Sequence, residues 1–105
     1  MTFYETVIFT AQIVDLIDDD SYTQLKIALV GDPEAGALIP GAKGLRKVRW
    51  KAQGRGKRGG IRIIYYLVCR TEIFMLYAYS KSEREDITPD QARQLRELVE
   101  QHLTQ

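Results

Sequence analysis

Lysine and arginine residues crowd into one twenty-residue block of this chain. Residues 43–62 contain nine basic residues and no acidic one. Residues 1–42 contain one basic and seven acidic residues, and residues 63–105 contain five basic and seven acidic residues. The net charge of +1 therefore conceals a polarised chain. Such a block favours an anionic partner, although a solvated basic loop would have the same composition.

Basic side chains interspersed with tyrosines suit the chemistry of RNA. Lysine and arginine neutralise phosphates, and tyrosine rings stack on unpaired bases. A lysine amine surrounded by other cations can give up its proton and then accept one, whereas arginine stays charged and stabilises negative charge on phosphate oxygens. Each tyrosine taken alone is more typical of core packing than of a base platform. We expect five residues to gather at one end of a sheet: Lys47, Arg49, Arg62, Tyr79 and Lys81.

Other site chemistries lack the residues they need. One histidine and one cysteine, far apart, exclude a structural zinc site, and a nucleophilic triad would need His102, which we expect to face solvent. Asp18–Asp20 lacks the spacing of a calcium loop. Gly56-Lys57 precedes an arginine, so it is not a phosphate-binding loop. We therefore expect no metal and no cofactor.

The first half of the chain predicts two helices. Thr6–Phe9 is a short β-type run, and Thr10 is a plausible cap for a helix over about 11–17, which Asp18–Asp20 would end. Ser21 and Gln24 form a capping-box pattern for a second helix through about Val30. Residues 31–44, rich in glycine and proline, predict a loop.

The second half predicts three strands and a helix. Residues 45–51 alternate, with Lys47 and Arg49 on one face and Val48 and Trp50 on the other. Residues 61–70 and 72–81 are apolar on both faces and predict a central antiparallel hairpin, which would place Arg62 near the end at 79–81. The glycine-rich stretch 53–60 predicts a turn that returns the first of these strands to the same region. Thr88-Pro89-Asp90-Gln91 combines several helix-start signals, and the helix would run to about residue 102.

This order, β-α-α-β-β-β-α, predicts an α+β fold with a small, mostly antiparallel sheet, two N-terminal helices and one C-terminal helix. We expect the helices on one face of the sheet and a single domain spanning residues 1–105. No apolar run is long enough for a membrane span, and a single cysteine, Cys69, fits a reducing cytoplasm.

Three motifs follow one another along the chain: GLRK-x-RW, GRGKRGGIR-x-IYY and YAYSK-x-E-x-EDITP. Together with VIFT and DPEAGALIPG nearer the N-terminus, they resemble the HigB-like branch of the RelE/ParE superfamily of toxins. The resemblance covers nearly the whole chain and implies a RelE-like fold.

The resemblance also implies an activity and partners. It implies a toxin of a type II toxin–antitoxin system that binds a cognate antitoxin protein. Members of the RelE type enter the ribosome and cleave mRNA by attack of a ribose 2′-OH on the adjacent phosphate, which leaves a 2′,3′-cyclic phosphate. Because the ribosome positions the message, such an enzyme can work without a His/Glu acid–base pair.

The family's functional residues carry over onto particular positions of this chain. Lys47, Arg62 and Lys81 match the catalytic positions, with Lys47 or Lys81 as general base and Arg62 stabilising the transition state. Arg49 and Arg84 match two further basic positions. The residues expected to bind RNA are Arg46, Arg49, Lys51, Arg55, Lys57, Arg58, Tyr79 and Arg84. Two positions depart from the family pattern: Thr88 stands where a tyrosine is found, and Ser82 where an arginine is found.

Two other functions remain open at this point. Members of the ParE type poison DNA gyrase on the same fold without cutting RNA, so that the fold alone does not decide between the activities. A non-catalytic RNA- or DNA-binding module would also account for the basic block at 43–62. Lys47, Arg62 and Lys81 together favour the ribonuclease.

Overall fold

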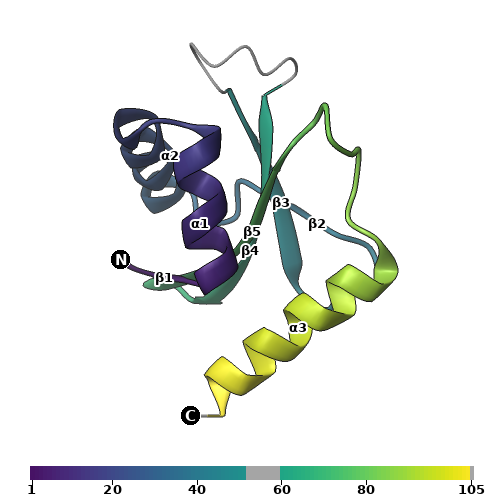
Figure 1. Cartoon of the computed structure of the whole chain (residues 1–105). Coiled ribbons are helices and arrows are strands. Elements are labelled where there is room, and N and C mark those ends of the chain that lie inside the picture. The colour runs from purple at the N-terminus through teal and green to yellow at the C-terminus, as the bar shows by residue number, and fades with distance from the viewer. Residues whose placement is uncertain (52–59, 105) are drawn as a thin grey trace.

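The computed structural model describes residues 1–51 and 60–104. A five-stranded mixed sheet forms its centre, in the order β1-β5-β4-β3-β2 (Figure 1). Its strands are β1 (Thr2–Glu5), β2 (Ala37–Leu38), β3 (Leu45–Trp50), β4 (Ile61–Cys69) and β5 (Glu72–Ser80). The helices are α1 (Val7–Leu16), α2 (Asp19–Gly31) and α3 (Pro89–Leu103). Only β1 runs parallel to its neighbour, β5, so the predicted α+β class with a mostly antiparallel sheet is confirmed.

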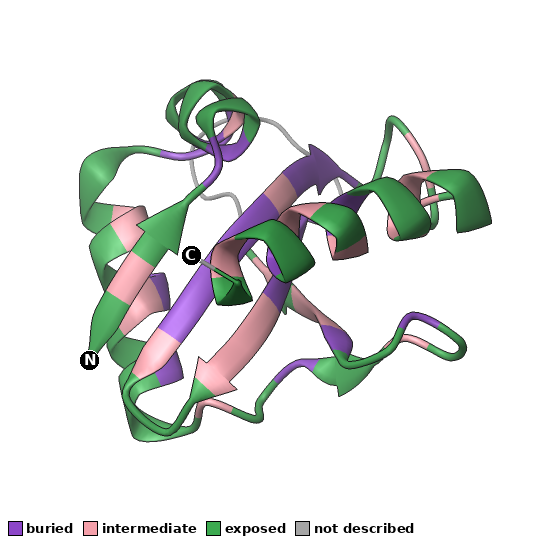
Figure 2. Ribbon diagram, turned by 90° about the horizontal axis from the view of Figure 1, so that it is seen from below, coloured by how far each residue is buried: buried purple, intermediate pink, exposed green. Residues whose placement is uncertain are grey.

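The helices cover both faces of the sheet, and the expectation of one covered face was wrong. Alternate residues of β4 explain the arrangement, because Ile63 and Tyr65 pack with α1 and α2 whereas Ile64 packs with α3. Figure 1 shows α1 and α2 on one side of the sheet and α3 on the other. The centre of the sheet is accordingly buried on both faces (Figure 2). The two-sided apolar pattern of 61–68 is what requires a helix on each face.

The N-terminal elements begin earlier than predicted. Thr6, not Thr10, caps α1: its hydroxyl accepts a hydrogen bond from the Phe9 N–H (2.9 Å) and donates one to the Leu76 carbonyl (2.8 Å). The predicted strand at Thr6–Phe9 is therefore the first turn of a helix, whose buried positions include Phe9 and Ile13. The strand lies just before it, where Thr2–Glu5 pairs with β5. That pairing involves residues about seventy positions away, so local pattern did not reveal it.

The second helix is capped by an aspartate. The Asp18 carboxylate accepts a hydrogen bond from the Ser21 N–H (2.8 Å), and Asp19 and Asp20 occupy the first turn. The predicted Ser21–Gln24 capping box is therefore not the start of α2. Acidic side chains are favourable there because they face the positive end of the helix dipole.

The C-terminal helix agrees closely with its predicted start. The Thr88 hydroxyl accepts from the Gln91 N–H (3.1 Å), and the Gln91 side chain accepts from the Thr88 N–H (2.9 Å), which completes the predicted capping box. The expectation that His102 faces solvent was wrong. Its ring is half-buried and lies 4.6 Å from the Tyr4 ring and 4.7 Å from the Phe74 ring, measured between centroids.

Candidate nucleic-acid interface

Three strands carry a row of the side chains predicted to form the site, on the α3 side of the sheet. Arg49 of β3 lies opposite Arg62 of β4, and Arg62 lies opposite Tyr79 of β5. Lys47 lies two residues before Arg49 and therefore shares its face. We call these four residues the basic face. They lie towards the end of the sheet at which β3 ends, β4 begins and β5 ends.

The predicted catalytic lysines both lie at this end of the sheet. Lys47 forms an ion pair with Asp86, in the segment that connects β5 to α3, and its side chain is 24% exposed. Lys81 is exposed and directly follows β5. Its backbone N–H donates to the Gly60 carbonyl (3.2 Å), which places it beside the start of β4 and so close to Arg62 in the fold.

Arg62 is the most deeply buried charge of the basic face. It is 4% exposed, and its Nη1 donates to the Ile61 carbonyl (3.2 Å). Water screens a buried charge much less than an exposed one. The guanidinium therefore exerts a strong positive potential on groups that lie close to it.

Tyr79 is also buried, at 2% exposure, and its hydroxyl donates to the Glu85 carbonyl (3.4 Å). Burial raises the pKa of this phenol above its usual value, the negative charge of Asp86 raises it further, and the cations Arg62 and Arg84 oppose the rise. Asp86, Arg62 and Arg84 thus all lie within electrostatic range of one phenol. The position of the ring corresponds to core packing, the alternative that the sequence left open for each tyrosine.

Arg84 is held against the start of α3. Its Nη1 donates to the Gln91 side-chain oxygen (2.7 Å), the same atom that caps the helix at Thr88. Among the described residues, the buried Nε of Arg84 has no hydrogen-bond partner. Thr88, at a position where the family pattern has a tyrosine, serves here as the helix cap.

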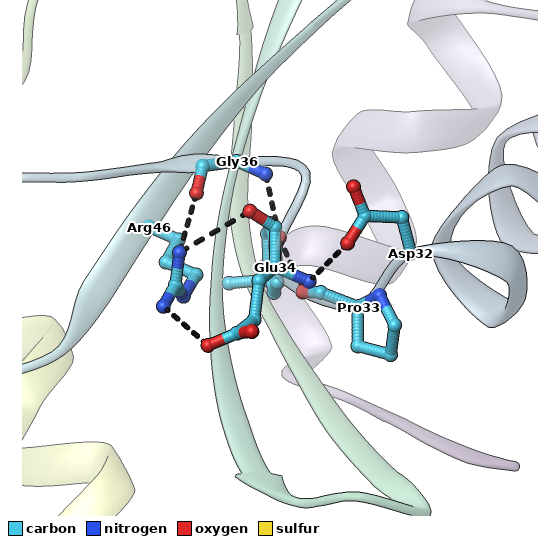
Figure 3. Close-up of polar contacts among 6 residues, drawn as sticks. Asp32, Pro33, Glu34, Gly36 and Arg46 are labelled. Atoms are coloured by element: carbon cyan, nitrogen blue, oxygen red, sulfur yellow. Dashed lines mark hydrogen bonds and ion pairs between the residues drawn. The ribbon is translucent and has the colours of Figure 1, made fainter.

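Arg46 lies on the opposite face of the sheet from the basic face. Its Nη1 donates to the carbonyls of Gly36 (2.8 Å) and Glu34 (3.3 Å), and its Nη2 pairs with the Glu34 carboxylate at 3.3 Å (Figure 3). The guanidinium thereby fastens the segment before β2 onto β3. Lys51 is exposed just beyond β3, whereas Arg55, Lys57 and Arg58 lie outside the described residues.

Asp86 is the residue that sequence reasoning missed. It stands 39 residues from Lys47, and nothing in the local pattern of 81–88 connects it to the basic block. The one signal for Asp86 was its place in the motif YAYSK-x-E-x-EDITP, five residues after the predicted catalytic Lys81. The structure therefore adds a carboxylate to a site that the sequence described as cationic.

The described residues also limit other chemistries. Within 1–51 and 60–104, no three or more His, Cys, Asp or Glu side chains gather in a way that could hold a metal ion. In the same residues, no helix is long and apolar enough to cross a membrane.

Comparison with known proteins identifies the family. Residues 35–105 match the family described as the RelE toxin of the RelE/RelB toxin–antitoxin system. The chain therefore belongs to the RelE toxin family. A solved structure of a double arginine-to-alanine variant of the Escherichia coli toxin RelE, in the free state, matches with a TM-score of 0.57 and 16% sequence identity. The match covers 80% of this chain and 86% of that one, and at this identity it supports the shared fold.

Proposed function

We propose that this protein is a ribosome-dependent mRNA endoribonuclease of the HigB-like branch. Membership of the RelE toxin family makes it a toxin of a toxin–antitoxin pair with an antitoxin protein as its partner. The observation that carries the ribonuclease proposal is the convergence of Lys47, Arg49 and Arg62 on one face, with Lys81 at its edge. Its place of action would be the cytoplasm, where translating ribosomes present mRNA.

The proposed reaction divides the work between lysine and arginine. The amine of Lys47 or Lys81 takes the proton of a ribose 2′-OH, whose oxygen attacks the adjacent phosphorus. The bond from phosphorus to the 5′ oxygen breaks, and this oxygen leaves as a 5′-OH after gaining a proton, which gives a 2′,3′-cyclic phosphate. The buried charge of Arg62 stabilises the negative charge that develops on the phosphate oxygens.

The exposed cations would hold the RNA. Arg49 is exposed next to Arg62, and Lys51 is exposed at the end of the same strand. Each phosphate contact releases counterions, so the interaction strengthens at low salt without depending on base sequence. Tyr79 would support the site from below by packing, since its ring is buried.

A cell-free translation assay tests the proposal. A defined message is translated with purified protein, and new 5′ ends are mapped along it. Wild type is expected to produce cuts that require translating ribosomes, and the triple variant Lys47→Ala, Arg62→Ala, Lys81→Ala is expected to produce none. Arg70→Ala, in the exposed turn between β4 and β5, is the matched control and should cut normally.

Two results would contradict the proposal, the first at its mechanism and the second at its function. Undiminished cutting by the triple variant would remove the basic face from the mechanism. Absence of cutting by wild type, together with inhibition of DNA supercoiling by gyrase, would assign the fold to the ParE-type activity instead. Circular dichroism of the triple variant separates lost chemistry from lost folding, because Arg62 is buried.

A further inference from the structure

We propose that Asp86 occupies, in the free protein, the phosphate subsite that Lys47 offers to RNA, so that an RNA phosphate must displace the carboxylate. The inference rests on the proposed RNA-binding function and deepens it. It makes Asp86 an internal competitor rather than a catalytic residue.

The first observation is the position of the ion pair. Lys47 points from β3 towards the segment between β5 and α3 and meets the Asp86 carboxylate there. The Asp86 side chain is 63% exposed, so the pair lies at the surface, where solvent reaches it. Exposed ion pairs are weak because water screens them and because two long side chains lose freedom. A phosphate that also contacts neighbouring cations can therefore replace this carboxylate.

The second observation is the surrounding charge. Asp86 raises the pKa of the buried Tyr79 phenol, whereas Arg62 and Arg84 lower it. The carboxylate thus stands among cations from β3, β4 and the segment after β5. A carboxylate and a phosphodiester each present anionic oxygens with one negative charge, and Lys47 can donate to either. Asp86 consequently meets the charge requirement of the site while RNA is absent.

The connecting segment gives the carboxylate a way out. Asp86 lies two residues before Thr88, the cap of α3, and its own backbone is not part of the sheet. A change of side-chain rotamer moves the carboxylate into solvent without disturbing the capping box. Displacement then costs the ion pair and little else.

The test uses the isolated full-length protein and a fluorescently labelled single-stranded RNA, with binding measured by anisotropy at several KCl concentrations. Asp86→Asn keeps the shape and a hydrogen-bond acceptor but removes the charge. We expect tighter binding than wild type, by up to about fivefold, because no ion pair has to be broken before the phosphate reaches Lys47. The plot of log affinity against log salt should keep nearly the same slope, since the same phosphate contact forms in both proteins. Glu85→Gln removes the neighbouring exposed charge without changing the Lys47–Asp86 pair, so it should tighten binding less than Asp86→Asn does.

A double-mutant comparison ties the effect to Lys47. If the carboxylate competes for Lys47, adding Asp86→Asn to Lys47→Ala should tighten binding no more than adding Glu85→Gln to Lys47→Ala does. Equal affinities for wild type and Asp86→Asn, with weaker binding by Lys47→Ala, would overturn the competition while leaving an RNA-binding role for Lys47. Absence of RNA binding by every variant would overturn the inference as well, and the translation assay then decides separately whether the protein is a ribonuclease. Urea unfolding of each variant checks that every protein in the binding comparison is folded.

Discussion

Arg49 in β3 lies directly opposite Arg62 in β4, and both side chains belong to the same face of the sheet. Like charges that face each other across antiparallel strands destabilise the pairing. We therefore expect Arg49→Gln to increase the free energy of unfolding by about 0.5 kcal/mol, measured by urea denaturation, while it weakens RNA binding. Arg70→Gln removes an exposed charge from the turn instead and should change neither quantity. A destabilised Arg49→Gln would mean that the two arginines share a partner that holds them together.

Arginine substitutions distinguish the two candidate general bases. Lys47→Arg and Lys81→Arg each retain a cation for phosphate but remove the amine that the proposed mechanism uses as general base. We expect one of the two variants to lose about a hundredfold or more in cleavage rate in the translation assay, with RNA affinity preserved. The other lysine is then a phosphate ligand. Normal rates in both variants would exclude lysine as the base.

Arg46 offers a contrast between a structural and a binding role. Because its guanidinium donates to the Gly36 carbonyl and Gly36 is buried, we expect Arg46→Gln to lower the free energy of unfolding by about 1–3 kcal/mol. Glu34→Gln removes only an ion pair whose acidic side chain is 71% exposed, so it should cost less than about 1 kcal/mol. The salt dependence of RNA binding should stay the same in both. A shallower slope for Arg46→Gln would instead support the RNA contact predicted from sequence.

Because Tyr65 and Tyr79 are buried, we expect the free energy of unfolding to fall in alkali. Burial raises the pKa of Tyr65 and of Tyr79 above the usual value for tyrosine, so the folded protein keeps protons that the unfolded chain releases above about pH 10. The unfolded state then binds fewer protons than the folded state, and the free energy of unfolding falls as pH rises. Each buried tyrosine contributes about 1.4 kcal/mol per pH unit to this slope.

Tyr79→Phe tests that slope with little other disturbance, because the hydroxyl makes one long hydrogen bond of 3.4 Å. The free energy of unfolding, measured with urea on both sides of about pH 10, should fall less steeply with pH than in wild type. The difference should equal the contribution of one tyrosine. Tyr65→Phe is a less clean variant, since its hydroxyl accepts from the Gly36 N–H and donates to the Pro33 carbonyl. An unchanged slope in Tyr79→Phe would show that this phenol ionises in the folded state.

The local sequence pattern was sufficient to predict the strands that carry the basic face. Alternation at 45–50 correctly separates Lys47 and Arg49 from Val48 and Trp50, since side chains of a strand point to opposite faces in turn. The short link after Cys69 requires a hairpin, and the hairpin register brings Arg62 opposite Tyr79. Strand geometry alone thus assembles most of the candidate site.

What the sequence did not reveal depends on distant contacts. Thr6 resembles a strand residue until β5 supplies the Leu76 carbonyl that its hydroxyl contacts. The location of α3 on the second face follows from how Leu95 and Val99 meet Ile64, and helical periodicity does not state which face of a sheet a helix covers. Asp86 reaches Lys47 only after β5 and its connecting segment have been placed.

The pairing of β1 with β5 has a consequence for the order in which a newly made chain matures. Thr2–Glu5 hydrogen-bonds with Glu72–Met75, and Gln12 accepts from the Ala78 N–H, so the N-terminal layer has no sheet to join until most of the chain has been synthesised. Contacts this distant in sequence form slowly because the long intervening loop must close first. A nascent copy therefore lacks its complete scaffold until β5 has been synthesised, and the basic face cannot form before then because Tyr79 belongs to that strand.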